Sequence, residues 1–254
     1  MEEKQTINVL WTGGLDSTYL IVKLCEIEGK NYPIQPYYIV DEKRKSAGKE
    51  LLAIRNITAA IRQSGKAKRT LLDAIIVERK SITEYPDITA AWNILYKEYT
   101  LGSQYDWLAR FARQENINLM VGVQMESRGK VVHTLEGKEM QKAYYGDVEV
   151  YSTKGVMELR KETALIFANM LFPCFIVGVS KVQEWEELHQ WGFGEVAKMT
   201  WFCHNPILGQ TCGQCNPCKD ALNEGMAFRV SKTGRFLGSC RSLVKKTYHL
   251  FLKS

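Results

Sequence analysis

Alternation of short apolar runs with amphipathic segments limits the possible folds of this chain more than any other feature. The apolar runs have the length of buried strands, and the segments between them repeat apolar residues at helical spacing. A first helix is expected after the capping side chains of Asp16 and Ser17, with its end at Gly29. We expect strands over residues 7–11, 36–40, 73–77 and 118–123, and further helices over 46–64 and 105–114.

Strands that alternate with helices favour a parallel sheet with helices on both faces, so the expected fold class is α/β and Rossmann-like. Two later helices, 158–169 and 181–191, flank a strand-like run over 172–177. The polar stretch 125–155 interrupts this rhythm. We interpret it as an excursion over the active-site edge, with a hairpin as one candidate form.

Composition is that of an ordinary globular protein, with 45% hydrophobic and 24% charged residues among 254. The chain has no apolar run of about 18 residues, which argues against a membrane-spanning helix. Its charged N-terminus lacks the pattern of a secretory signal, so we expect a cytoplasmic protein. We divide the chain into an α/β domain, 1–198, and a smaller cysteine-rich region with a basic tail, 199–254.

Basic residues are concentrated near the C-terminus. The net charge is +6, and residues 226–254 hold seven Lys or Arg and no Asp or Glu. Two interpretations remain open: a solvated helix face, or contact with an anion such as a nucleotide, a nucleic acid or an acidic partner.

A glycine pair lies between the first strand and the first helix, in the segment Thr12-Gly13-Gly14-Leu15-Asp16-Ser17. Glycines let the backbone turn its N–H groups toward an anion, and the start of a helix favours negative charge. Ser17 adds a hydroxyl donor, whereas Asp16 implies Mg²⁺ or a role in orienting the loop. The alternative is a glycine-rich turn before a capped helix.

Two other nucleotide-binding patterns are set aside. The Walker pattern of phosphate-binding kinases and GTPases does not occur in the chain. Residues 192–197 match a dinucleotide-binding pattern, but they follow a helix instead of a strand, so we interpret them as a helix stop.

Four cysteines lie within sixteen residues, at a spacing typical of a metal site. Two cysteines two residues apart can hold one tetrahedral ion, and four protein ligands leave no open position for catalysis. We therefore expect structural zinc, with an iron–sulfur cluster or a redox pair as alternatives. The predicted ligands are Cys203, Cys212, Cys215 and Cys218.

Together the loop and the cysteine knot resemble those of the 7-cyano-7-deazaguanine synthases, which are PP-loop ATP pyrophosphatases. The segments 198–203 and 212–218 are similar to that family's entry to and continuation of the knot, and 173–181 is similar to its proline strand and lysine-headed helix. The resemblance covers most of residues 7–220.

The resemblance implies a ligase that uses ATP to activate the carboxylate of 7-carboxy-7-deazaguanine. Ammonia then gives an amide, a second ATP helps to form the nitrile, and AMP and pyrophosphate are released. ATP, Mg²⁺ and Zn²⁺ are the implied cofactors, and a homodimer is the implied assembly. Asp16, Ser17 and Lys181 are the implied catalytic residues. The implied nucleotide-binding residues are Leu10, Trp11, Thr12, Gly13, Gly14, Leu15, Asp16, Ser17 and Thr18.

Departures from the family pattern fall on the side of the pocket that binds the base. Thr12 stands where the family usually has serine. Gly102-Ser103-Gln104-Tyr105 replaces an arginine–asparagine pair, and residues 122–127 lack a glycine-tyrosine-proline-aspartate stretch. Gln104 and Gln124 are the substrate-binding candidates in these segments.

Three other functions remain open. Divergent members resembling this family occur in bacterial antiviral defence, where some attach a deazaguanine to a protein partner. A PP-loop enzyme that modifies tRNA is a second alternative. A zinc-knuckle protein that binds nucleic acid through the basic tail is a third, and its affinity would fall steeply with salt.

Overall fold

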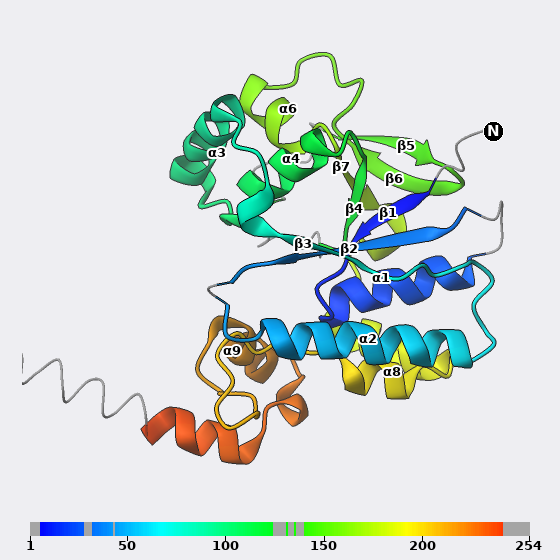
Figure 1. Cartoon of the computed structure of the whole chain (residues 1–254), viewed down its shortest axis with the longest axis vertical. Helices are drawn as coiled ribbons and strands as arrows, with labels where there is room; N and C mark the ends of the chain where they lie inside the picture. The colour runs from blue at the N-terminus through cyan, green and yellow to red at the C-terminus, as the bar shows by residue number, and fades with distance from the viewer. Residues whose placement is uncertain are drawn as a thin grey trace, which may run out of the picture.

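A seven-stranded sheet forms the centre of the computed structural model, which describes residues 6–27, 32–42, 44–123, 131, 135 and 140–240 (Figure 1). The strand order is β3-β2-β1-β4-β7-β6-β5. The first five of these strands run parallel, and β6 and β5 add an antiparallel edge. The strands are β1 (Ile7–Leu10), β2 (Ile34–Val40), β3 (Ile75–Glu78), β4 (Leu119–Val121), β5 (Gln141–Tyr145), β6 (Val148–Ser152) and β7 (Met170–Pro173).

Helices cover both faces of this sheet, as expected for an α/β fold (Figure 1). One face carries α1 (Leu15–Glu26), α2 (Ala47–Gln63), α7 (Lys181–Gln190) and α8 (Gly194–Met199), which contact one another. The other face carries α3 (Pro86–Tyr99), α4 (Gln104–Gln114) and α6 (Lys161–Phe167). Each layer buries its own apolar core, and β1 and β4 contribute residues to both.

The C-terminal region lies beside one end of α2 (Figure 1). It contains the cysteine knot, α9 (Asn216–Asn223), the short 3₁₀ helix η3 (Ala227–Arg229) and a helix over residues 232–240. Two further 3₁₀ turns, η1 (Arg79–Ser81) and η2 (Cys174–Ile176), follow β3 and β7.

The N-terminal parts of the fold agree with the sequence prediction to within a few residues. Strands occur near all four expected positions, and α2 buries Ile54, Ile57 and Ile61 on its inner side. Gly192 ends α7 with φ +78°, which confirms the helix stop. The expected end of the first helix at Gly29 lies outside the described residues.

Three local expectations were wrong, and one helix was missed. Gly14 is the N-cap of α1 and makes no side-chain cap, so Asp16 and Ser17 lie in its first turn. The strand expected over 172–177 is β7, which ends at Pro173 because proline has no N–H to continue a ladder. The helix expected over 158–169 spans only Lys161–Phe167, and beyond it the Asn169 carbonyl accepts a hydrogen bond from Leu119 N–H of β4 at 2.8 Å. Helix α3 was not predicted at all.

Within the stretch 125–155, residues 140–155 form a hairpin that does not lie over the active-site edge, whereas residues 125–139, apart from 131 and 135, lie outside the described residues. Strands β5 and β6 turn at Gly146 and extend the sheet beyond β7. None of residues 140–155 lines the cavity described below. The hairpin instead widens the sheet, and its Val148 and Val150 side chains are buried in the core on the α1 face.

Candidate active site and metal centre

A cavity of about 320 Å³ lies at the carboxyl ends of β1, β2 and β4. The chain leaves β1 toward β2 on one side, whereas β4 lies on the other side of β1. Ligands of open parallel sheets bind at such a reversal of strand order. The volume is within the range of small-molecule sites. Its charged and polar lining residues are Thr12, Asp16, Ser17, Asp41, Arg44, Glu50, Gln104, Lys181, His204, Asp220 and Arg229, together with the hydroxyl of Tyr38.

Side-chain hydroxyls close the loop between β1 and α1. Ser17 Oγ accepts a hydrogen bond from Thr12 N–H at 3.3 Å and lies 3.1 Å from Thr12 Oγ1. Gly14, the N-cap of α1, lines the cavity beside these residues. The first N–H groups of a helix have no partner within it, so the start of α1 offers donors at the cavity.

Glycine is required where the loop meets its neighbours. Gly13 has φ +70°, and a Cβ there would lie 3.0 Å from the Glu50 carbonyl oxygen of α2. A Cβ on Gly122, after β4, would lie 3.2 Å from the Asp16 carbonyl oxygen. The start of α1 thus packs directly on α2 and on the end of β4.

Three of the nine predicted nucleotide-binding residues do not line the cavity. Trp11 and Thr18 are fully buried, and the Trp11 indole N–H donates to Thr18 Oγ1 at 3.0 Å. Gly13 is the third such residue, and it is also buried. Leu10, Leu15 and the remaining four members line the cavity.

Lys181 reaches the cavity from the first position of α7. A capping box of Ser180 and Gln183 fixes the start of this helix. Lys181 Nζ pairs with Glu224 Oε2 at 3.0 Å. Burial, the largest single influence, lowers the pKa of Lys181, but Asp16 and Glu224 together raise that pKa above its ordinary value. The side chain is therefore a cation at neutral pH.

Arg229 of η3 is a second cation at the cavity, and the sequence had marked it only as one charge of the basic tail. Its Nη2 donates to the Thr200 carbonyl oxygen at 3.0 Å and to Thr200 Oγ1 at 2.5 Å. The guanidinium lies over the rings of Phe202, at 4.7 Å, and Trp185, at 5.4 Å. Loss of hydration lowers the pKa of Arg229 to about 10, although Asp16 and Glu184 favour its charged form.

Glu50 forms a buried acidic network on the α2 side of the cavity, which the sequence did not reveal. Only 3% of the residue is exposed. Its carboxylate accepts hydrogen bonds from Ser46 Oγ at 2.6 Å and Tyr38 Oη at 2.8 Å, and it pairs with Arg44 at 3.4 Å. Burial, followed by the charge of Glu50, raises the pKa of Tyr38, so the phenol remains a donor.

Of the two predicted substrate-binding residues, only Gln104 lies among the described residues. Gln104, at the start of α4, lines the cavity with Trp107 of the same helix. Gln124 lies outside the described residues. This part of the cavity lining combines an amide and an indole ring, which suit hydrogen bonding and stacking with a planar heterocycle.

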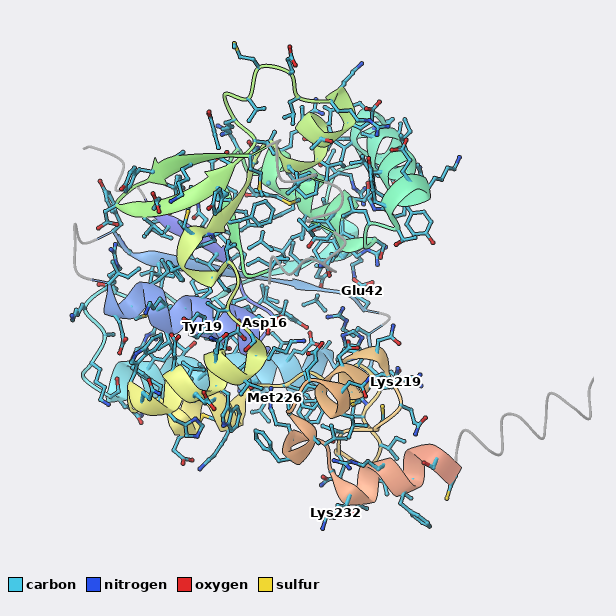
Figure 2. All side chains as sticks on the ribbon, turned by 180° about the vertical axis from the view of Figure 1, so that it is seen from behind. Asp16, Tyr19, Glu42, Lys219, Met226 and Lys232 are labelled. Carbon is cyan, nitrogen blue, oxygen red and sulfur yellow. The ribbon has the colours of Figure 1, made fainter. Side chains whose placement is uncertain are left out.

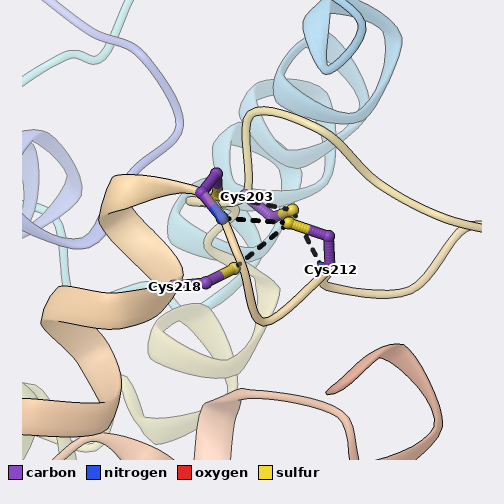
Figure 3. A group of neighbouring side chains, drawn as sticks. Cys203, Cys212 and Cys218 are labelled. Atoms are coloured by element: carbon purple, nitrogen blue, oxygen red, sulfur yellow. Dashed lines mark hydrogen bonds between the residues drawn. The ribbon is translucent and has the colours of Figure 1, made fainter. Parts of the chain in front are cut away.

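The four predicted metal ligands converge in space (Figure 3). Their sulfur atoms all lie within 4.8 Å of one another. Sγ of Cys212 lies 4.0 Å from that of Cys218, and Sγ of Cys215 lies 3.9 Å from that of Cys203. Zinc–sulfur bonds of about 2.3 Å in a tetrahedron require sulfurs about 3.8 Å apart. The group could therefore hold a metal ion such as zinc.

Backbone N–H groups support the negative charge that such a site needs. The N–H of Cys212 donates to Cys203 Sγ at 3.2 Å (Figure 3). The N–H groups of Gln214 and Cys215 donate to Cys212 Sγ at 3.4 and 3.3 Å. Hydrogen bonds to sulfur favour the thiolate over the thiol. Cys215 is the N-cap of α9, so the helix start also favours its thiolate.

Comparison with protein-family models gives no match, and no curated protein is significantly similar to the chain. Among the described residues, no helix has both the length and the apolar character needed to cross a membrane.

Proposed function

We propose that this protein is a PP-loop ATP pyrophosphatase that adenylates the carboxylate of 7-carboxy-7-deazaguanine and transfers the acyl group to ammonia. The observation that carries the proposal is the gathering of the glycine loop and Lys181 around one cavity at the reversal of strand order. This arrangement places helix N–H donors and a cation where a polyphosphate would bind.

The chemistry needs phosphate binding more than it needs an acid or a base. A carboxylate is a poor electrophile, and adenylation gives it a leaving group. One carboxylate oxygen attacks the α-phosphorus, and the bond to pyrophosphate breaks. Ammonia then attacks the acyl carbon, AMP leaves with that oxygen, and the amide remains after loss of a proton. Catalysis rests on holding the phosphates and on stabilising charge in the transition state.

In this proposal the residues have distinct tasks. The loop from Thr12 to Ser17 holds the phosphates through N–H and hydroxyl donors. Lys181 balances the charge of the departing pyrophosphate. Asp16 lines the same cavity, and its carboxylate oxygens suit a Mg²⁺ ion that accompanies the nucleotide. Magnesium would supply charge neutralisation of the phosphates.

The cysteine group suits structural zinc in the same scheme. Four thiolates leave no position for water, so the ion would fix the C-terminal region instead of taking part in the reaction. The Rossmann-like ATP-binding fold of this enzyme class is in agreement with the parallel strand order.

The test is to incubate the zinc-loaded protein with ATP, Mg²⁺, ammonium and 7-carboxy-7-deazaguanine, and to follow products by mass spectrometry. We expect AMP and pyrophosphate only when the acid is present, together with the amide or nitrile. The Asp16→Asn variant is the matched control and should lose this turnover. AMP formation that does not depend on the acid would contradict the proposed substrate.

Ammonia is the acceptor that this experiment examines. If AMP forms with the acid but ammonium produces no amide, the adenylation remains and the acceptor is a different amine. A tRNA or protein acceptor would then be tested by adding it in place of ammonium.

A further inference from the structure

Arg229 and Lys181 line the same cavity as Asp16 and come from two separate elements. Lys181 begins α7, whereas Arg229 ends η3, and Asp16 favours the charged form of both. All three residues line the cavity. Figure 2 shows Met226, the N-cap of η3, on the segment that faces the Asp16 end of α1.

The guanidinium of Arg229 is held in one orientation. Its Cζ lies over the rings of Phe202 and Trp185, and Nη2 donates to both oxygens of Thr200. Among the described residues, both of its hydrogen bonds come from Nη2. The N–H groups of Nε and Nη1 are therefore left as donors for a cavity ligand.

We propose that Arg229 binds the phosphates of the nucleotide together with Lys181, and that it selects for polyphosphate over the bare nucleoside. A preorientated guanidinium presents paired donors to phosphate oxygens, and the low hydration of this site strengthens the contact. The inference rests on the proposed use of ATP. It does not depend on which acid is adenylated.

The ratio of ATP affinity to adenosine affinity distinguishes phosphate binding by Arg229 from a purely structural role of this residue. We would measure the dissociation constants of both ligands, and of pyrophosphate, by calorimetry on the zinc-loaded full chain. Arg229→Met should weaken ATP and pyrophosphate binding about 10- to 100-fold, as expected for the loss of a hydrogen bond to a charged group. Adenosine affinity should change by less than about twofold.

Lys232→Met is the matched control. It removes one positive charge from the same basic stretch, but Lys232 is exposed and lies on the outer side of the C-terminal helix, away from Asp16 (Figure 2). All three affinities should stay within about twofold of those of the unmodified protein, because Lys232 does not line the cavity and salt screens an exposed charge.

Arg229→Lys keeps the measurement informative if the methionine variant does not fold. Lysine keeps the charge but not the paired donors, so the preference for ATP over adenosine should fall about 3- to 10-fold. Equal loss of ATP and adenosine affinity, or an unchanged preference in the variants, would overturn the role of Arg229 alone. An unmodified protein that binds ATP no more tightly than adenosine would overturn the proposed function as well.

Discussion

The N–H of Trp201 donates a hydrogen bond to the carbonyl oxygen of Gly13 at 2.8 Å. Trp201 lies two residues before the first metal-ligand candidate, Cys203, and Gly13 lies in the loop between β1 and α1. The cysteine knot is thus joined directly to the loop that we propose to bind phosphate. Thr200, the neighbour of Trp201, also holds Arg229.

Metal removal should therefore weaken nucleotide binding, although the proposed ion does not touch the nucleotide. We expect Cys212→Ser to lower the melting temperature by at least about 10 °C, since a loss of several kcal/mol shifts it by about 2–4 °C per kcal/mol in a chain of this size. ATP affinity should fall in parallel. Differential scanning fluorimetry and calorimetry would measure both quantities.

Cys240→Ser is the control for that prediction. Cys240 is exposed and does not belong to the cysteine group. Its substitution should leave zinc content, melting temperature and ATP affinity unchanged. Equal effects of the two substitutions would contradict a structural metal at Cys212.

Gly13→Ala should damage the phosphate loop because the added methyl group has no space. The backbone has φ +70°, and the new Cβ would lie 3.0 Å from the Glu50 carbonyl oxygen. We expect the free energy of unfolding to fall by about 1–3 kcal/mol. Gly48→Ala, in the same helix as Glu50 and with nothing within 4 Å of its Cβ, should be neutral or slightly stabilising. Urea titration of both variants tests the contrast.

Two glycines seat the C-terminal helix on the cysteine knot. A Cβ on Gly234 would overlap the carbonyl oxygen of Thr211, and one on Gly238 would overlap that of Cys212. Gly234→Ala should therefore push residues 232–240 away from the knot and cost about 1–3 kcal/mol. The rate of amide hydrogen exchange should rise both in residues 232–240 and in the cysteine knot. Thr233→Ala, at an exposed position of the same helix, should leave exchange unchanged.

Lys181→Met should reduce AMP formation by about 100-fold or more, because a cation next to developing phosphate charge acts mainly in the transition state. The rate constant kcat should fall more than ATP affinity. Lys219→Met is the comparison, since Lys219 is an exposed lysine of α9 in the same part of the chain (Figure 2). A rate loss of the same size in both variants would count against a specific role for Lys181.

Sequence patterns predicted the parts of the fold whose signals are local. Apolar runs located β1 to β4, and the glycine pair located the turn before α1. Helix α3 was missed because most of its residues are exposed and only Ile88, Ala91 and Leu95 are buried, although Pro86 at its start was a usable signal. The hairpin position depends on pairing with β7, which is a non-local contact.

The contrast between local signals and non-local contacts also applies to the candidate site. The four cysteines and the loop from Thr12 to Ser17 lie close in sequence, so their spacing was informative. Arg229 and Glu50 come to the cavity from regions that are distant in sequence, through the packing of η3 and α2. In the sequence one resembled a tail charge and the other a surface residue of a helix, and only tertiary structure separates these cases.

The most direct test of the central proposal follows one oxygen atom. We would supply 7-carboxy-7-deazaguanine labelled with ¹⁸O in its carboxylate, with unlabelled ATP and water, and weigh the AMP produced by mass spectrometry. Adenylation predicts one ¹⁸O atom in each AMP formed, because the carboxylate oxygen that attacks the α-phosphorus leaves with it. AMP without the label would mean that water or another nucleophile attacks ATP, and would contradict adenylation of this acid.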